Sequence, residues 1–91
     1  MPRPTAQQIA AAAHVLATEW DEDGSKLSRD PAAYQHFGAG IADMIIHDPP
    51  PGTLAEYLGV LEAQLALPLS SEAQRSAWAE RLEATVRAQA G

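Results

Sequence analysis

The segment from Asp30 to His47 reads DPAAYQHFGAGIADMIIH and is the most informative part of the sequence about the fold. It begins with Asp30 and Pro31, an N-cap residue followed by a proline, which a helix tolerates in its first turn. At about 100° per residue, the large apolar side chains of the stretch fall on one stripe, the pattern of a helix that packs on a core. These side chains are Tyr34, Phe37, Ile41, Met44 and Ile45. We therefore expect a helix over residues 31–47.

Two glycines, Gly38 and Gly40, interrupt this helix, and each costs about 1 kcal/mol relative to alanine in a helix interior. Glycine leaves room for another backbone, so both positions predict close approach of a neighbouring helix. The neighbour we expect is the first helix, which contains four consecutive alanines at residues 10–13. The segment DPPPG, residues 48–52, ends the helix because consecutive prolines cannot continue it.

Capping boxes, in which Ser or Thr is followed three residues later by Glu or Gln, mark the starts of the other helices. The pairs are Thr5 with Gln8, Thr53 with Glu56, and Ser71 with Gln74. Pro68 ends the third helix, and no segment shows the alternating apolar pattern of a strand. The expected fold is all-α, a compact bundle of four short helices in a single domain over residues 1–91. The expected helices span residues 6–20, 31–47, 54–67 and 72–89.

The composition excludes several classes of function. The chain has no cysteine, which removes disulfides, thiolate nucleophiles and cysteine-ligated metal centres. Its net charge is −6, and residues from Asp30 to Glu72 include six acids but neither Lys nor Arg. Binding to nucleic acid or to anionic lipid needs clustered cations, so both are disfavoured and a basic protein partner is expected.

The acidic turn EWDEDG, residues 19–24, follows the first helix. Trp20 belongs by its spacing to the core stripe of that helix. Carboxylates at the carboxyl end of a helix oppose its macrodipole, typically by about 0.3–1 kcal/mol each, and local choices that conflict with the fold often mark function. Alternatively, Lys26 and Arg29 fold back and neutralise these acids.

The candidate site residues form two groups. A partner-binding surface is expected to include Glu19, Asp21, Glu22, Asp23, Asp43 and Asp48. A structural role is expected for Trp20, Gly24, Tyr34, Phe37 and Glu62.

Metal sites are not supported by the spacing of possible ligands. Counted from Asp21, an EF-hand loop requires Gly at position six and Glu at position twelve, where this chain has Lys26 and Ala32. On the outward face of the second helix, His36 lies seven residues from Asp43, or about 10 Å along a helix, too far to share one ion without help from another element. We expect no metal and no cofactor.

Catalytic and DNA-binding motifs are not found either. The sequence has no Gly-x-Ser-x-Gly elbow and no phosphate-binding glycine loop, so an enzyme is not expected. The segment TLAEYLGV resembles the first helix of a helix-turn-helix motif, but the residues that follow continue the same helix and carry no basic group.

Several short motifs in this order resemble the YugE-like group of small bacterial proteins of unknown function. The resemblance spans roughly residues 16–86 and implies an all-helical fold without an assigned activity. It is carried by Trp20, Asp21, Gly24, Tyr34, IADMII, LAEYLGVLE with Glu62, and LALPL. The chain has Glu22 and Asp23 where that group has proline in the turn.

The function expected from the sequence is that of a non-enzymatic, acidic protein–protein interaction module of the immunity or antitoxin type. One alternative is a self-associating structural module, for which Ile46, on the flank of the second helix, is the residue to inspect. A metal-dependent enzyme is a third and weaker alternative. The segment MPRPTAQQ does not read as a signal peptide, and no run approaches the roughly 20 apolar residues that span a bilayer, so the expected location is cytoplasmic.

Overall fold

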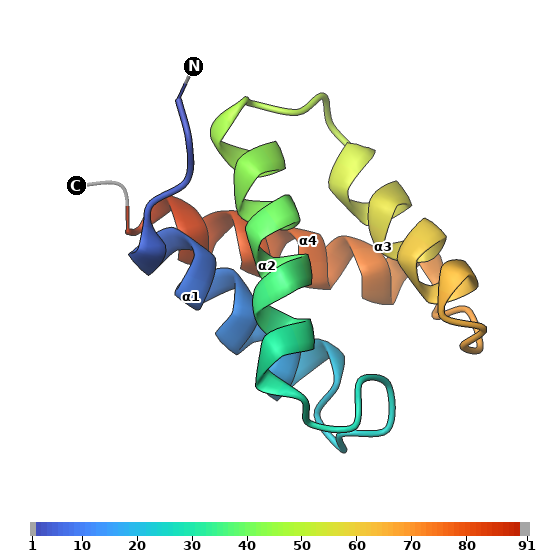
Figure 1. The fold of residues 1–91 in the computed structure, drawn as a ribbon. Coiled ribbons are helices and arrows are strands. Elements are labelled where there is room, and N and C mark those ends of the chain that lie inside the picture. Colours follow the sequence, from blue (N-terminus) through green and yellow to red (C-terminus); the bar gives the residue numbers. More distant parts are fainter. Residues whose placement is uncertain (1, 90–91) are drawn as a thin grey trace.

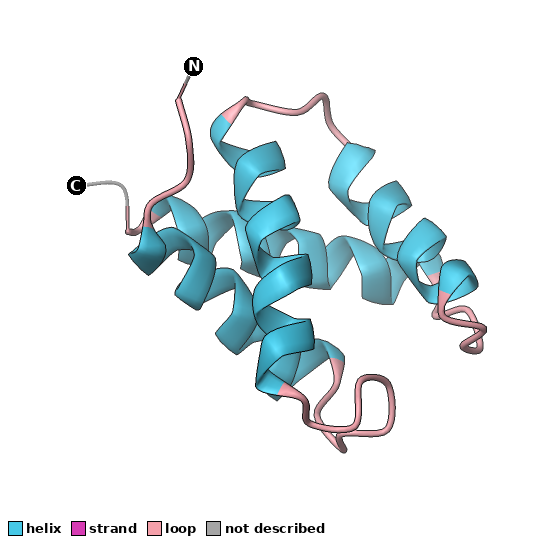
Figure 2. Ribbon diagram, in the orientation of Figure 1, coloured by secondary structure: helices cyan, strands magenta, loops and turns pink. Residues whose placement is uncertain are grey.

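Helices joined by loops make up the computed structural model, which describes residues 2–89 and has no strand in that range (Figure 2). The all-α prediction is thus confirmed. The elements are α1 (Ala6–Val15), the π-helical turn η1 (Leu16–Trp20), α2 (Pro31–Ile46), α3 (Thr53–Gln64) and α4 (Glu72–Arg87). None of these helices has the length and apolar content needed to cross a membrane.

The last helix holds the bundle together. α4 runs behind the other three helices and contacts each of them (Figure 1). α2 packs most extensively on α1, whereas α2 and α3 touch only sparsely. The last helix therefore bridges two halves, the α1–α2 pair and α3.

Close packing of α1 on α2 depends on one of the two glycines. A Cβ atom on Gly38 would lie 2.9 Å from the backbone N of Ala13 and 3.1 Å from the carbonyl oxygen of Ile9. The prediction of close helix approach is therefore correct at Gly38. At Gly40 it is wrong, because a Cβ there would meet nothing nearer than the Tyr57 hydroxyl at 3.7 Å.

Most helix starts follow the sequence signals. Thr5 and Ser71 each accept a hydrogen bond in a complete capping box, and Asp30 caps α2 through the N–H of Ala32. The capping box expected at Thr53 is wrong. Gly52, with φ of 87°, is the N-cap of α3, so Thr53 is already helical and its side chain caps nothing.

The end of α3 comes three residues before the predicted one. The N–H of Leu67 donates to the Glu62 carbonyl at 2.9 Å, and the N–H of Ala66 donates to the Ala63 carbonyl at 3.1 Å. This pair of bonds is the Schellman motif, which requires a left-handed residue at the position of Ala66. Ala66 has φ of 57°, so the chain turns away before Pro68 is reached.

The first helix widens into a π-turn at its end. The N–H of Asp21 donates to the Leu16 carbonyl, five residues back, at 2.8 Å. Nearby, the Thr18 hydroxyl donates to the His14 carbonyl at 2.7 Å, a side-chain bond that competes with the helical ladder. The predicted range 6–20 is helical throughout, but its last five residues are π rather than α.

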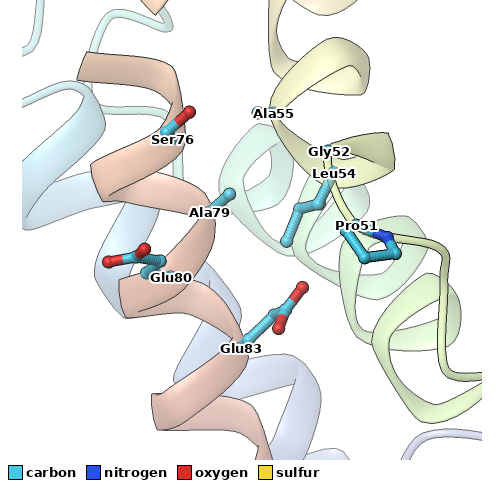
Figure 3. Close-up of a pocket in the computed structure, with 8 residues that line it drawn as sticks. All are labelled: Pro51, Gly52, Leu54, Ala55, Ser76, Ala79, Glu80 and Glu83. Atoms are coloured by element: carbon cyan, nitrogen blue, oxygen red, sulfur yellow. The ribbon is translucent and has the colours of Figure 1, made fainter. Parts of the chain in front are cut away.

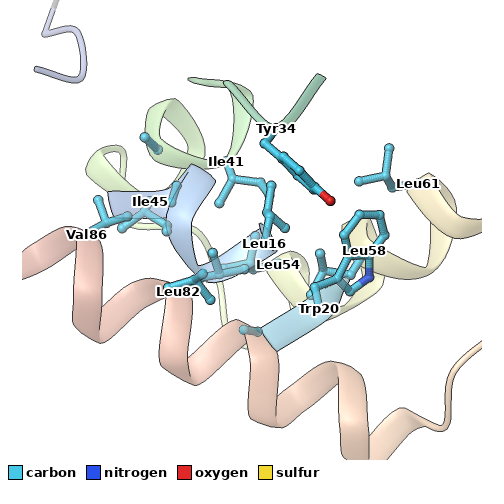
Figure 4. Packing of buried hydrophobic residues seen from close by; sticks show 14 of the residues in the cluster. Leu16, Trp20, Tyr34, Ile41, Ile45, Leu54, Leu58, Leu61, Leu82 and Val86 are labelled. Atoms are coloured by element: carbon cyan, nitrogen blue, oxygen red, sulfur yellow. The ribbon is translucent and has the colours of Figure 1, made fainter. Parts of the chain in front are cut away.

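One hydrophobic core draws on every helix (Figure 4). Leu16 and Trp20 of η1 lie there with residues of α2, α3 and α4. The residues of α2 in this core include Tyr34 and Ile41. Phe37 and Met44, expected in the same stripe, are only partly buried because they lie on its flank. The other labelled core residues are Ile45, Leu54, Leu58, Leu61, Leu82 and Val86.

Candidate functional site

A buried carboxylate organises the turn after the first helix. Asp21 is fully buried and accepts three hydrogen bonds. Two come from backbone N–H groups, that of Lys26 at 2.8 Å and that of Leu27 at 2.9 Å. The third comes from the hydroxyl of Tyr34, in the first turn of α2, at 2.6 Å. Asp21 therefore closes the turn and fastens it to α2.

The surroundings of Asp21 favour its charged form. Burial raises the pKa of Asp21, but hydrogen bonds from Tyr34 and two backbone N–H groups, with the charge of Lys26, outweigh burial and hold that pKa below its ordinary 3.8. Burial, the hydrogen bond to Asp21 and the charge of Asp21 raise the pKa of Tyr34 above its ordinary 10.0. The expectation that Asp21 faces a partner is wrong, because its oxygens are enclosed and bonded within the fold.

A second buried carboxylate, that of Glu62 on α3, supports the same region. Glu62 accepts the indole N–H of Trp20 at 3.3 Å. It also accepts the hydroxyl of Ser70 at 2.6 Å and the backbone N–H of Ser70 at 3.0 Å. Glu62 thus joins the π-turn, α3 and the loop that leads to α4.

The ammonium group of Lys26 lies between two tryptophans. It donates to the Trp20 carbonyl at 2.6 Å and is 5.3 Å from the centroid of the Trp20 ring. The centroid of the Trp78 ring, on α4, is 5.5 Å away. Both separations are within the range of cation–π attraction. The charge of Lys26 is therefore directed at aromatic faces and a carbonyl.

Self-neutralisation of the acidic turn by ion pairs is not what the structure shows. Among residues 2–89, neither Lys26 nor Arg29 forms an ion pair with Glu22 or Asp23. The side chain of Arg29 instead covers Gly24, where a Cβ atom would lie 2.6 Å from the Arg29 Cγ. Gly24 has φ of 75°, so this position favours glycine for its backbone conformation as well.

The other three acids of the turn differ in their ion pairs within residues 2–89: Glu19 forms one, and Glu22 and Asp23 do not. Glu19 accepts the guanidinium Nε–H of Arg81, on α4, at 2.9 Å. Glu22 and Asp23 are exposed, and within the described residues neither takes part in an ion pair. Hydrogen bonds from the backbone N–H and the hydroxyl of Ser25 lower the pKa of Asp23, so it is charged at neutral pH.

These groups surround an open pocket of about 390 Å³, which we call the acidic pocket. Its lining is mostly polar and comes from the turn on one side and from the beginning of α4 on the other. The lining residues are Glu19, Trp20, Glu22, Asp23, Lys26, Ser70, Gln74 and Trp78. The two exposed carboxylates, which form no ion pair within residues 2–89, suit a cationic group, whereas the two tryptophan rings already hold the ammonium of Lys26.

The other predicted partner-binding acids lie outside the acidic pocket. Asp48 accepts a hydrogen bond from Arg87 at 3.2 Å, and the Oδ1 of Asp43 lies 3.8 Å from the Nδ1 of His47. His36, placed on the same outward face, packs edge-on against Phe37. Within residues 2–89, no three side chains of the His, Cys, Asp or Glu type gather closely enough to hold a metal ion.

A smaller cavity of about 240 Å³ lies between the start of α3 and α4 (Figure 3). Glu83 points toward Pro51 and Leu54 there, whereas the side chain of Glu80 turns away. A single carboxylate facing the cavity provides no acid–base pair among the residues that line it. The lining residues are Pro51, Gly52, Leu54, Ala55, Ser76, Ala79, Glu80 and Glu83.

Comparison with known proteins finds no match for this chain among protein-family models, curated proteins or solved structures. The resemblance to the YugE-like group therefore stays a hypothesis.

The sequence did not predict three residues of the acidic pocket, Ser70, Gln74 and Trp78, or the ion-pair partner of Glu19, Arg81, all of which come from the opposite end of the chain. No local pattern joins them to the turn. The burial of Asp21 had one signal in the sequence. Asp21 lies between Trp20 and Leu27, two apolar residues that are both buried in this short turn. A carboxylate in that position is a candidate acceptor for the N–H groups of its own turn.

Proposed function

We propose that this chain is a non-enzymatic cytoplasmic module that binds a basic protein partner through the acidic pocket, in the manner of an immunity or antitoxin protein. The observation that carries the proposal is the exposure of Glu22 and Asp23, neither of which has an ion-pair partner among residues 2–89, while the ammonium of Lys26 is bonded to the Trp20 carbonyl.

Desolvation of charged groups sets the cost of binding at the acidic pocket. Exposed carboxylates cost little to desolvate, and a partner's Arg or Lys gains the attraction of their charge, while the Trp78 ring is already covered by Lys26. The pocket is built on a rigid base, because Asp21 bonds to Tyr34 of α2 and Glu62 of α3 bonds to Trp20. Rigid placement lowers the entropy that binding must overcome.

Affinity capture with two baits tests the proposal. The test bait carries Glu22→Gln and Asp23→Asn, which keep the side-chain size and the oxygen that accepts from Ser25. The control bait carries Glu56→Gln and Glu80→Gln, which remove the same charge from exposed sites outside the pocket. A partner captured by the wild type and the control, lost by the test bait and released by salt supports the proposal. Equal capture by all three baits, or capture that ignores salt, contradicts it.

Self-association is a second candidate, favoured by two exposed apolar side chains, Val60 at 48% and Leu69 at 65% exposure. Ile46, the residue first considered for this role, is half-buried and lines a small pocket with Val86. Light scattering over a range of concentrations distinguishes the candidates. A mass that rises with concentration and falls back in Leu69→Ser favours self-association, whereas a constant monomer mass removes it.

A further inference from the structure

The ammonium of Lys26 fills part of the acidic pocket. It lies 5.3 Å from the centroid of the Trp20 ring, on η1, and 5.5 Å from that of the Trp78 ring, on α4. We call the space between these two rings the tryptophan site. Both tryptophans and Lys26 line the acidic pocket, so the tryptophan site faces it. The spacing of the rings suits an alkylammonium group, since the site already holds one.

Few polar contacts hold the Lys26 side chain in the tryptophan site. Within residues 2–89 its Nζ donates one hydrogen bond, to the Trp20 carbonyl at 2.6 Å, and forms no ion pair. An ammonium group has three donors, so this bond uses only one of them. The backbone N–H of Lys26, and not its ammonium, donates to Asp21. The side chain can therefore leave the site while the turn keeps its hydrogen bonds to Asp21.

Two carboxylates of the same pocket can receive the Lys26 ammonium when it leaves the rings. Glu22 and Asp23 line the pocket with Lys26, are exposed, and form no ion pair within the described residues. Lysine carries its charge on a flexible four-carbon stem, which allows the ammonium to move between neighbouring acceptors. Such a movement replaces cation–π attraction with attraction to a carboxylate and leaves both rings to another cation.

We propose that Lys26 is an internal competitor in the acidic pocket, and that a lysine of the partner protein enters the tryptophan site by displacing the Lys26 ammonium. The inference rests on the proposed function, because it names how that pocket receives the cation of a basic partner. The occupant is a lysine, since the two rings and the Trp20 carbonyl are arranged around an ammonium. Two ammonium groups of like charge cannot share this space, so the affinity of the pocket depends on the exchange.

Fluorescence titration of the full chain tests this inference. Trp20 and Trp78 are the only tryptophans of the chain, so their emission reports on the site alone. The probe is a short peptide, capped at both ends, with one central lysine. The control peptide has norleucine in place of that lysine, which keeps the apolar stem and removes the charge. Lys26→Ala empties the site and should bind the lysine peptide about tenfold more tightly than wild type, with no such gain for the norleucine peptide.

Arg29→Ala is the matched control variant. It removes the same positive charge from an exposed side chain of the same loop that does not line the pocket. Its affinity for the lysine peptide should stay within about twofold of wild type, because solvent and salt screen an exposed charge. Adding Trp78→Leu to Lys26→Ala should remove the gain. Equal gains from Lys26→Ala and Arg29→Ala, or equal binding of both peptides, would overturn the inference.

A measurement on the wild type does not depend on the folding of Lys26→Ala. Lys26 is the only lysine, and its ε-methylene group adjoins an ammonium that lies over two indole rings, whose ring currents shift its resonances upfield. Addition of the lysine peptide should move these resonances toward those of a solvated lysine. Resonances that stay upfield while the indole signals respond, or no response of either, would contradict displacement.

The two proposals fail in different experiments. Equal partner capture by the wild type and by the bait with Glu22→Gln and Asp23→Asn contradicts the proposed function. The peptide titrations measure the exchange at Lys26 without the partner protein, so their failure overturns only the inference about Lys26.

Discussion

The hydroxyl of Tyr34 donates to the carboxylate of Asp21 at 2.6 Å, and both groups are buried. This bond joins the end of the first helix to the first turn of α2 across the whole acidic loop. The acids of the turn therefore have different roles. Asp21 is buried and holds the loop in place, whereas Glu22 and Asp23 are exposed to solvent.

Asp21→Asn should lower the free energy of unfolding by about 3 kcal/mol, because hydrogen bonds to a buried charged group are strong and an amide N–H would face backbone N–H donors. Tyr34→Phe, which removes one donor of three, should cost about 1–2 kcal/mol. Urea denaturation measures both. Asp23→Asn is the exposed control and should change stability by less than about 0.5 kcal/mol. Equal losses from Asp21→Asn and Asp23→Asn would mean that the buried network is not what stabilises the turn.

The stability that Asp21 contributes should depend on pH in the acid range. Its pKa is lower in the folded chain than the ordinary 3.8, so the folded state favours the charged form. The contribution is complete above the unfolded pKa and is lost as pH falls through the lower folded pKa. Urea denaturation from pH 6 down to pH 2 should show the difference in stability between wild type and Asp21→Asn becoming smaller as the pH falls. A constant difference over that range would contradict the assigned pKa direction.

Substitution of the two glycines of α2 should have opposite effects. Gly38→Ala places a methyl group against the backbone of Ala13 and should destabilise the fold by about 1–3 kcal/mol or more. Gly40→Ala, in the same helix, meets only ordinary contacts and should stabilise by up to about 1 kcal/mol through helix propensity. Thermal and urea denaturation compare the pair. If both variants are stabilised, α1 can move away from α2 at low cost.

Ala66→Gly should stabilise the protein by about 0.5–1 kcal/mol. Ala66 occupies a left-handed position at the end of α3, where a Cβ atom costs roughly 1–2 kcal/mol and glycine is the usual residue. Part of this gain is offset by the greater freedom of glycine in the unfolded chain. Ala77→Gly, at an exposed position inside α4, is the control and should destabilise by about 1 kcal/mol. Destabilisation by both substitutions would contradict the Schellman geometry.

The helices and the centre of the core could be predicted from local sequence signals. Caps at Thr5, Asp30 and Ser71 are local, since a side chain bonds to a backbone N–H two or three residues away, and their effect can be read without the rest of the fold. The position of Trp20 in the core is also a local prediction, because helical spacing decides which face of a helix a residue occupies.

Which acids are buried and which glycine is needed depends on contacts between helices. Asp21 resembles its neighbours in the sequence, and its burial depends on Tyr34, which a separate helix brings to it. Gly38 and Gly40 are alike in propensity, and only the path of α1 distinguishes them. Burial of a polar group requires partners that arrive from elsewhere in the chain, as Glu62 meets Trp20 across 42 residues, and no local pattern specifies such a meeting.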